Sequence, residues 1–222
     1  MLADSLNWIA EKLEAGIAKG EDKTAVVITV LQELMTLHGN VIFGGDGYSS
    51  EWHRVAVEER GLKNIPTSAD ALPAFKEESV VKLFESTGVL SPAELASRFE
   101  VYAEQYILSI EMETNLVIDL ASTRIYPATV GYLDSLASAA SNLNGLDIEM
   151  SHSSIQEIAN EANAMMASVR KLKKAISVEN FASIEEHMNY CAKTLCPIML
   201  EVRSHADALK GLVADDLWPL PK

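Results

Sequence analysis

One stretch of the sequence constrains the fold more than any other, because it has the pattern of a single helix too long for a spherical protein. Ser91–Glu94 combines a capping serine, a proline at the first helical position and a glutamate that can return to the cap. Apolar residues then keep helical spacing, with no breaker before Pro127. The residues from Pro92 to Tyr126 would span about 52 Å as a helix. That length exceeds the diameter of a 222-residue sphere, so an elongated fold is expected.

Pro127 lies inside this pattern, which continues towards Leu143. A proline removes one internal hydrogen bond and clashes with the preceding turn of a helix. The sequence therefore predicts one long helix over residues 91–143, kinked at Pro127.

Two further capping boxes indicate two more long helices. They are Ser154–Glu157 and Ser183–Glu186, and the helices they open are expected to run to about Ala175 and Leu209. No apolar alternation is long enough for a strand, and the nearest candidate is Val41–Phe43. The predicted fold is all-α: an elongated antiparallel helical bundle with a kinked long central helix and two further long helices within residues 151–211.

Residues 1–90 are predicted to form shorter helices and loops around a glycine-rich loop. No repeat, low-complexity tract or proline-rich linker divides the chain, so 1–222 is expected to be a single helical domain. Ser68 is the expected cap of a single helical turn. The other expected helices are Leu2–Ala15, Lys23–Leu37, Glu51–Arg60 and Glu77–Thr87, and the loop is Val41–Ser50.

The charge of the chain limits its partners. Lys and Arg number 18 against 32 Asp and Glu, which gives a net charge of −14. Such a chain is a poor ligand for nucleic acid or an anionic membrane, because both are bound through Lys and Arg. The sequence contains neither an apolar run of membrane-spanning length nor a signal-peptide pattern. With Cys191 and Cys196 as the only cysteines, the cytoplasm is the expected location.

The glycine cluster Gly44–Gly47 has two interpretations. Glycine backbones can turn several N–H groups towards a phosphate, but Tyr48 and Ser49 follow where a P-loop needs Lys and Ser or Thr. The favoured interpretation is a structural loop between helices, with Asp46 capping a backbone N–H rather than binding a metal. Whether this loop approaches an active site built elsewhere is not determined by the sequence.

Four histidines suggest sites only weakly. Glu149 and His152 have the spacing of a di-iron motif, but the motif occurs once and in a linker, which favours a solvated loop. His205 with Lys210 lacks the three-residue spacing of phosphotransfer bundles, as the lysine is rotated about 140° away. His187 and His53 lie among charged neighbours and are most simply surface side chains.

Other chemically suggestive residues also have simple structural interpretations. Three acids in the long helix fit either a cavity or polar seam, or a solvated face, with the solvated face favoured. Cys191 and Cys196 lack zinc-finger partners and fit small core positions. Trp52 and Trp218 fit an interface or packing within the chain. The three acids are Glu111, Glu113 and Asp119, and the residues expected in the core of the same helix are Tyr102, Tyr106, Met112 and Leu116. No catalytic, cofactor-binding or metal-ligating residue is assigned in this chain.

Several phrases of the sequence, in order, resemble type III glutamine synthetases. Within Asn40–Phe75 an Asp-Gly-Tyr-Ser phrase leads into a tryptophan-bearing segment and then an Arg-Gly-Leu turn. The resemblance continues through residues 88–91, 97–100, 104–112, 125–128 and 215–221, and so covers nearly the whole chain. These phrases are specific in combination, although none is a catalytic signature.

The resemblance implies a parent enzyme that joins ammonia to L-glutamate with ATP and Mg or Mn, in a cytoplasmic double-ring homo-oligomer. The family's metal-binding glutamates, nucleotide motifs and phosphate-binding arginine are not found in this sequence. We therefore expect a C-terminal region that is catalytically silent alone and supports the rest of the catalytic subunit or the contacts between subunits. Met1 is then expected to open a fragment within a longer helix. The alternative is a free-standing helical interaction module without ligase activity; an independent bundle enzyme is less favoured.

Overall fold

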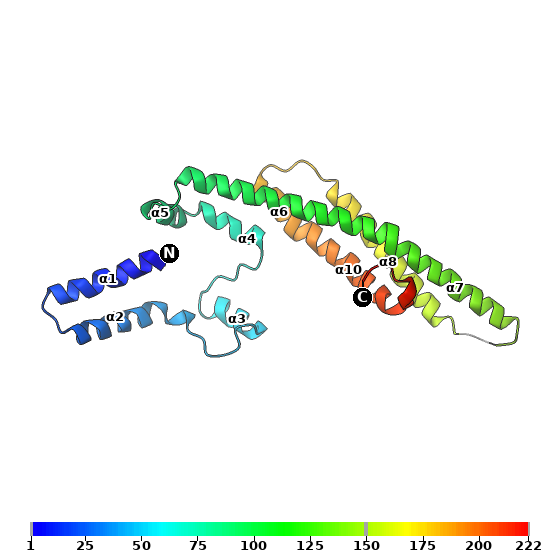
Figure 1. The fold of residues 1–222 in the computed structure, drawn as a ribbon, viewed down its shortest axis with the longest axis horizontal. Helices are drawn as coiled ribbons and strands as arrows, with labels where there is room; N and C mark the ends of the chain where they lie inside the picture. Colours follow the sequence, from blue (N-terminus) through cyan, green and yellow to red (C-terminus); the bar gives the residue numbers. More distant parts are fainter. Residues whose placement is uncertain (1, 149–150, 222) are drawn as a thin grey trace. The chain divides into compact units, whose positions relative to one another are not determined.

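The computed structural model describes residues 2–148 and 151–221, and within them it contains helices and no strand (Figure 1). The all-α fold is thus confirmed. The chain forms two compact units, residues 1–99 (unit 1) and residues 100–222 (unit 2). The expectation of a single domain stays a prediction.

The long helix begins and ends where the sequence predicts. It consists of α6 (Pro92–Leu120), the π-helical turn η3 (Ala121–Ile125) and α7 (Tyr126–Asn144). At its start Glu94 N–H donates to Ser91 Oγ, 3.3 Å away, and Ser91 N–H donates to Glu94 Oε2, 2.8 Å away. The hydrogen bonds from the Ser91 backbone and side chain lower the pKa of Glu94 below its usual value. The predicted capping box is therefore formed.

The predicted kink is built as a π-helical turn. In η3 the Tyr126 N–H donates to the carbonyl of Ala121, five residues back, and Pro127 follows directly in the first turn of α7. The wider turn lets the helix continue past a residue that lacks an N–H. The same device recurs at Pro197, which the sequence analysis did not consider: η4 (Cys191–Leu195) joins α9 (Ile184–Tyr190) to α10 (Cys196–Leu212).

Unit 2 is an antiparallel bundle. The α6–α7 rod, α8 (Ser153–Ile176) and α9–α10 run in alternating directions, and α8 packs along α10 and against α7 (Figure 1). The inner face of α8 carries fully buried apolar side chains, among them Met165, Val169 and Leu172. Tyr190 Oη donates to the carbonyl of Ala175, 3.0 Å away, which ties α9 to the end of α8.

The two later capping boxes have different outcomes. Ser183 is the N-cap of α9, because its Oγ accepts from Glu186 N–H at 3.1 Å, which confirms the prediction. The prediction for Ser154 is wrong, since α8 already begins at Ser153 with His152 at the N-cap position.

Unit 1 starts with the hairpin of α1 (Leu2–Ala18) and α2 (Lys23–His38), joined through Gly20 at φ +82°. Gly16 lies so close to α2 that an added Cβ would stand 2.6 Å from Val26 Cγ1. The remaining elements are short. They are η1 (Gly39–Val41), α3 (Ser50–Glu58), α4 (Ser68–Ala71), η2 (Leu72–Lys76) and α5 (Glu78–Ser86), while η5 (Asp215–Leu217) lies near the end of unit 2.

The turn around residue 68 shows the limit of reading caps from sequence. Thr67, not Ser68, caps α4, because the Thr67 Oγ1 accepts from Asp70 N–H at 3.1 Å. Either hydroxyl would satisfy the orphan N–H groups, and the backbone places Thr67 in the extended conformation that an N-cap requires.

The glycine-rich loop is held by aromatic stacking. Phe43 stacks on Trp52 with ring centroids 3.9 Å apart, and the Arg60 guanidinium lies 5.1 Å from the Trp52 ring centroid. Arg60 also donates to the backbone carbonyl of Ile42. Asp46 Oδ1 accepts from Tyr48 N–H at 2.9 Å, so its predicted capping role is confirmed. Packing within the chain also accounts for Trp52.

Candidate functional site

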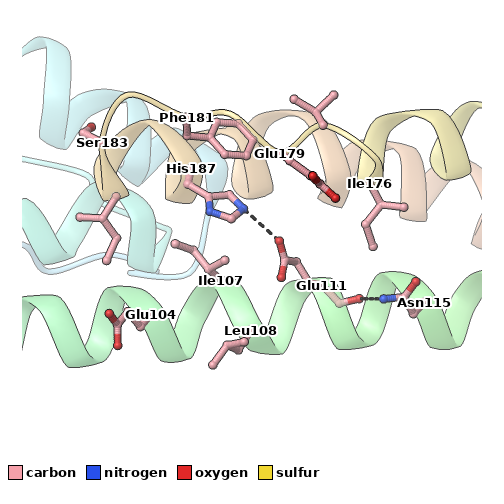
Figure 2. Close-up of a pocket in the computed structure, with 12 residues that line it drawn as sticks. Glu104, Ile107, Leu108, Glu111, Asn115, Ile176, Glu179, Phe181, Ser183 and His187 are labelled. Atoms are coloured by element: carbon pink, nitrogen blue, oxygen red, sulfur yellow. Dashed lines mark hydrogen bonds and ion pairs between the residues drawn. The ribbon is translucent and has the colours of Figure 1, made fainter.

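A histidine and a glutamate from distant parts of the chain meet in unit 2. His187 Nε2 lies 2.9 Å from Glu111 Oε1, and the pair joins α9 to α6 (Figure 2). The two side chains are 27% and 35% exposed. The interpretation of His187 as a simple surface residue is therefore wrong, because the bundle brings α6 beside it.

This pair stands in a pocket with a negative lining. The cavity measures about 920 Å³ and includes the carboxylates of Glu104, Glu111 and Glu179. Within the part of the chain that the structure describes, Glu104 and Glu179 form no ion pair. The lining contains three carboxylates and one imidazole, so the pocket is negative whether or not His187 is protonated.

One wall of the pocket is aromatic. Phe181 stacks on the His187 ring, with centroids 4.1 Å apart and planes inclined by 12° (Figure 2). Asn115 Nδ2 donates to the backbone carbonyl of Glu111, 3.0 Å away, and so holds one side of the pocket in place. A flat, negative, partly apolar site of this kind suits an organic cation such as a guanidinium or alkylammonium group. The sequence analysis missed Glu104, Glu179 and Phe181.

The three acids of the long helix lie in different surroundings. Glu111 lines the pocket, whereas Glu113 and Asp119 are exposed. The favoured interpretation, a solvated face, is confirmed for Glu113 and Asp119, whereas Glu111 lines a cavity, and a function of that cavity stays a prediction.

The other histidines do not form a reaction centre with these groups. His205 Nδ1 lies 2.8 Å from Glu161 Oε2, a second histidine–glutamate pair that joins α10 to α8. His53 is exposed, as predicted. Glu149 lies outside the described residues, so the Glu149–His152 hypothesis is untested there. Among residues 2–148 and 151–221 there is no group of three or more His, Cys, Asp or Glu side chains that could hold a metal ion.

The two cysteines flank the turn η4 and are both free thiols. Cys191 is fully buried, and burial raises the pKa of its thiol to about 11, with the Glu111 carboxylate adding to the rise. Burial also raises the pKa of the half-buried Cys196. The core interpretation is confirmed for Cys191 and only partly for Cys196.

The predicted core residues of α6 are mostly on the wrong face. Tyr102, Met112 and Leu116 are exposed, while Tyr106 is half-buried. The buried face of α6 is instead formed by other residues, which are Leu95, Phe99, Ala103, Ile107 and Thr114. The helix is apolar on two sides, so periodicity alone could not say which side the bundle would cover.

Trp218 packs within the chain. It lines an apolar hollow of about 340 Å³ together with Val117 of α6 and Val202 of α10. The C-terminal segment thus folds back on the bundle of unit 2.

Fold and site together define an acidic, all-helical chain in which His187 and His205 pair with glutamates of neighbouring helices. A family model described as glutamine synthetase C-terminal domain matches residues 26–144, more than half of the chain. Across the whole chain the sequence is 31% identical to a type-3 glutamine synthetase of Dictyostelium discoideum and 27% identical to a glutamine synthetase of Bacteroides fragilis. The chain belongs to the glutamine synthetase C-terminal domain family. The resemblance inferred from its residues is thereby confirmed.

The chain spans 31% of the length of each of these two relatives. A glutamine synthetase of Butyrivibrio fibrisolvens is 27% identical over 91% of the chain and 29% of its own length. No helix among the described residues is long and apolar enough to cross a membrane.

Proposed function

We propose that this chain is the C-terminal helical region of a subunit that ligates ammonia to L-glutamate with ATP. The catalytic groups, the nucleotide site and the Mg or Mn site lie in the remaining part of the subunit, and this region supports that part and the contacts between subunits. The support for this proposal is the family match together with the length of the relatives, of which this chain corresponds to 31%.

The observation that carries the supporting role is the two-sided apolar character of α2. Val26 and Val30 are buried against α1, whereas Ile28, Leu31 and Met35 lie about half a turn away and are exposed. These three residues line a continuous hollow on the outer face. A helix that is apolar on both sides is typical of a buried helix, so a further protein surface is expected to cover it.

The polar residues fit a catalytically silent region. His187 and His205 each pair with a glutamate of a neighbouring helix, as an interhelical tie would. Arg54 is engaged by Glu51, Glu58 and Glu59 on the same helix and its flank. These side chains therefore stabilise the helices to which they belong and the contacts between them.

We also assign the subunit to a homo-oligomer, arranged as a double ring, in the cytoplasm. Both thiols are free, which suits a reducing compartment. The net charge of −14 disfavours nucleic acid and anionic membranes as partners.

The first test is the activity of the purified chain with glutamate, ammonia, ATP and Mg²⁺. We expect no phosphate release above the level without enzyme. Phosphate release at the rate of an intact glutamine synthetase would place the catalytic groups inside this chain and refute the proposal.

The second test addresses support of the assembly in the full-length subunit. Ile28→Glu with Met35→Glu is expected to lower both the assembled fraction and ligase activity, because it places charges under the expected cover. Val130→Glu with Leu200→Glu, at two exposed apolar positions of unit 2, is the matched double control and should leave both unchanged. Normal assembly and activity of the double variant would show that no further protein surface covers the outer face of α2 and would refute the supporting role.

A further inference from the structure

We propose that the outer face of α6 and the acidic pocket beside it bind an amphipathic helix of a partner protein that carries Arg or Lys along one edge of its apolar face. The inference concerns unit 2 alone. It rests on the exposure of one stripe of α6 and on the charges along its edge.

The stripe is narrow and continuous. Val101, Leu108, Met112 and Leu116 are 52–68% exposed. At 100° per residue these four positions fall within an arc of about 80°, opposite the buried face of the same helix. Val101, Leu108 and Met112 also line a shallow hollow of about 520 Å³ with polar neighbours. We call these four residues the α6 stripe.

One edge of the α6 stripe is acidic. Glu104 and Glu111 lie on the same side of the stripe, and both line the pocket that contains Glu179 and His187. Glu104 and Leu108 line both the pocket and the shallow hollow, so the two hollows form one surface. In Figure 2 the Glu111 side chain points to His187, and Phe181 covers the imidazole from the far side.

Charge complementarity selects the occupant. A second copy of this chain would bring the same carboxylates to the edge of its own stripe, and like charges across an interface weaken it. An anionic lipid surface is repelled in the same way. A helix with cationic residues beside its apolar face instead places leucine-like side chains on the stripe and a guanidinium or ammonium in the pocket. There it would meet Glu104 and Glu179, which form no ion pair with any other described residue, and the flat Phe181–His187 stack.

The length of the stripe sets the size of the occupant. From Val101 to Leu116 the helix rises about 22 Å, which corresponds to about four turns. A partner helix of about 15 residues would cover it.

The test uses two synthetic capped peptides of about 18 residues, long enough to cover the stripe. One has leucines on one helical face and arginines along one edge, and the other has glutamates in place of the arginines. Fluorescence anisotropy with the full chain at physiological salt is expected to show saturable binding of the arginine peptide and none of the glutamate peptide. Absence of arginine-peptide binding, or equal binding of both, overturns the proposal.

Variants locate the binding. Glu104→Gln with Glu179→Gln, and separately Leu108→Ser with Met112→Ser, should each weaken arginine-peptide binding about tenfold or more. Matched controls elsewhere in unit 2 are Asp134→Asn with Glu157→Gln for charge, and Val130→Ser with Leu200→Ser for exposed apolar area. These should change the affinity less than twofold. Equal losses in test and control variants would show unspecific attraction to an acidic protein and overturn the proposal.

Two further outcomes also overturn it. Sedimentation velocity of the chain alone would reveal self-association, and its loss in the Leu108→Ser, Met112→Ser variant would assign the stripe to a second copy. Binding to phosphatidylserine vesicles that depends on the same residues would assign it to a membrane. Far-UV circular dichroism confirms that each variant remains folded.

Discussion

The two units of this chain distribute their apolar residues in opposite ways. Among the described residues, six buried apolar side chains lie in unit 1 and eighteen in unit 2, whereas fifteen exposed large apolar side chains lie in unit 1 and eleven in unit 2. Unit 2 thus contains its own core, with α8 at the centre. Unit 1 has the apolar residues for a core but leaves most of them open, as a region does when another surface is meant to cover it.

The comparison also explains why the histidines and cysteines, which are common in catalytic and metal sites, have structural roles in this chain. In unit 2, His187 and His205 pair with glutamates of neighbouring helices, and the Cys191 thiol is buried in the bundle. The open surfaces, on α2 in unit 1 and on α6 in unit 2, are apolar. The features of this chain that remain available to other molecules are therefore these two apolar surfaces and the acidic pocket beside α6.

The largest predicted effect is on the free energy of unfolding, and it distinguishes the buried core of unit 2 from the open face of unit 1. Leu172→Ala removes a side chain that is 0% exposed in unit 2 and should lower the free energy of unfolding by about 2–5 kcal/mol. Leu31→Ala on the open face of α2 should change it by no more than about 0.5 kcal/mol. Urea unfolding followed by far-UV circular dichroism measures both. Similar losses would show that unit 1 is as well packed as unit 2.

The second prediction uses Cys191 as a probe of unit 2. A thiol pKa of about 11 instead of 9.0 lowers the thiolate fraction about hundredfold below pH 9. In a Cys196→Ser variant, Cys191 should react with iodoacetamide at least about a hundredfold more slowly in the native chain than in the urea-unfolded chain. Because folding raises this pKa, the stabilisation from the buried neutral thiol is present below pH 9 and is lost as the pH rises through about 11.

The same variant can also show which of the two units unfolds at the lower urea concentration. Trp8 and Trp52 lie in unit 1, so adding Trp218→Phe leaves fluorescence that reports on unit 1 alone. We expect the fluorescence transition at a lower urea concentration than Cys191 labelling. Coincident transitions would indicate that the two units unfold together.

The third prediction tests the tightest contact in unit 1. Gly16→Ala should destabilise the α1–α2 hairpin by about 1–3 kcal/mol, because the new Cβ would overlap the Val26 side chain. Gly131→Ala in α7 meets no atom within 4 Å and should stabilise unit 2 by about 0.5–1 kcal/mol. Amide hydrogen exchange resolves the two effects, and it should be faster in α1 and α2 only for the first variant.

The smallest effect concerns helix caps. Ser91→Ala should cost about 1 kcal/mol, because it removes the acceptor for Glu94 N–H. Ser154→Ala should cost less than about 0.5 kcal/mol, since that serine caps nothing. The pKa of Glu94 is lowered in the folded chain, so the contribution of its carboxylate is present above its ordinary pKa and is lost as the pH falls. Thermal unfolding of both variants at neutral and acidic pH would test this, and equal losses would contradict the assigned caps.

The sequence predicted the helices closely and the site poorly. Helix starts at Ser91 and Ser183 were correct because a capping box is a contact between residues three apart, which the sequence displays directly. The misassigned cap at Ser68 has an equivalent hydroxyl beside it in Thr67, so local chemistry left the choice open, whereas α8 begins after His152 without a side-chain cap. The π-helical turns were not predicted as such, although the proline at the first of them was recognised.

The pocket was not predictable because its members are distant in sequence. His187 and Glu111 are 76 residues apart, and each alone looks like a solvated polar residue. Met112 and Leu116 show the converse case, in which an apolar pattern was assigned to the core although the structure leaves it exposed.

The sequence by itself therefore determined the all-α fold, the kinked 53-residue helix and the family, because caps, breakers and short family-like phrases are local features of the chain. Only the tertiary structure decided which face of α6 is covered, where the acids and histidines meet and how unit 1 differs from unit 2. The physical reason is that burial and pairing depend on which helices lie beside each other. When a helix is apolar on two faces, its own sequence does not determine which face a neighbouring helix will cover.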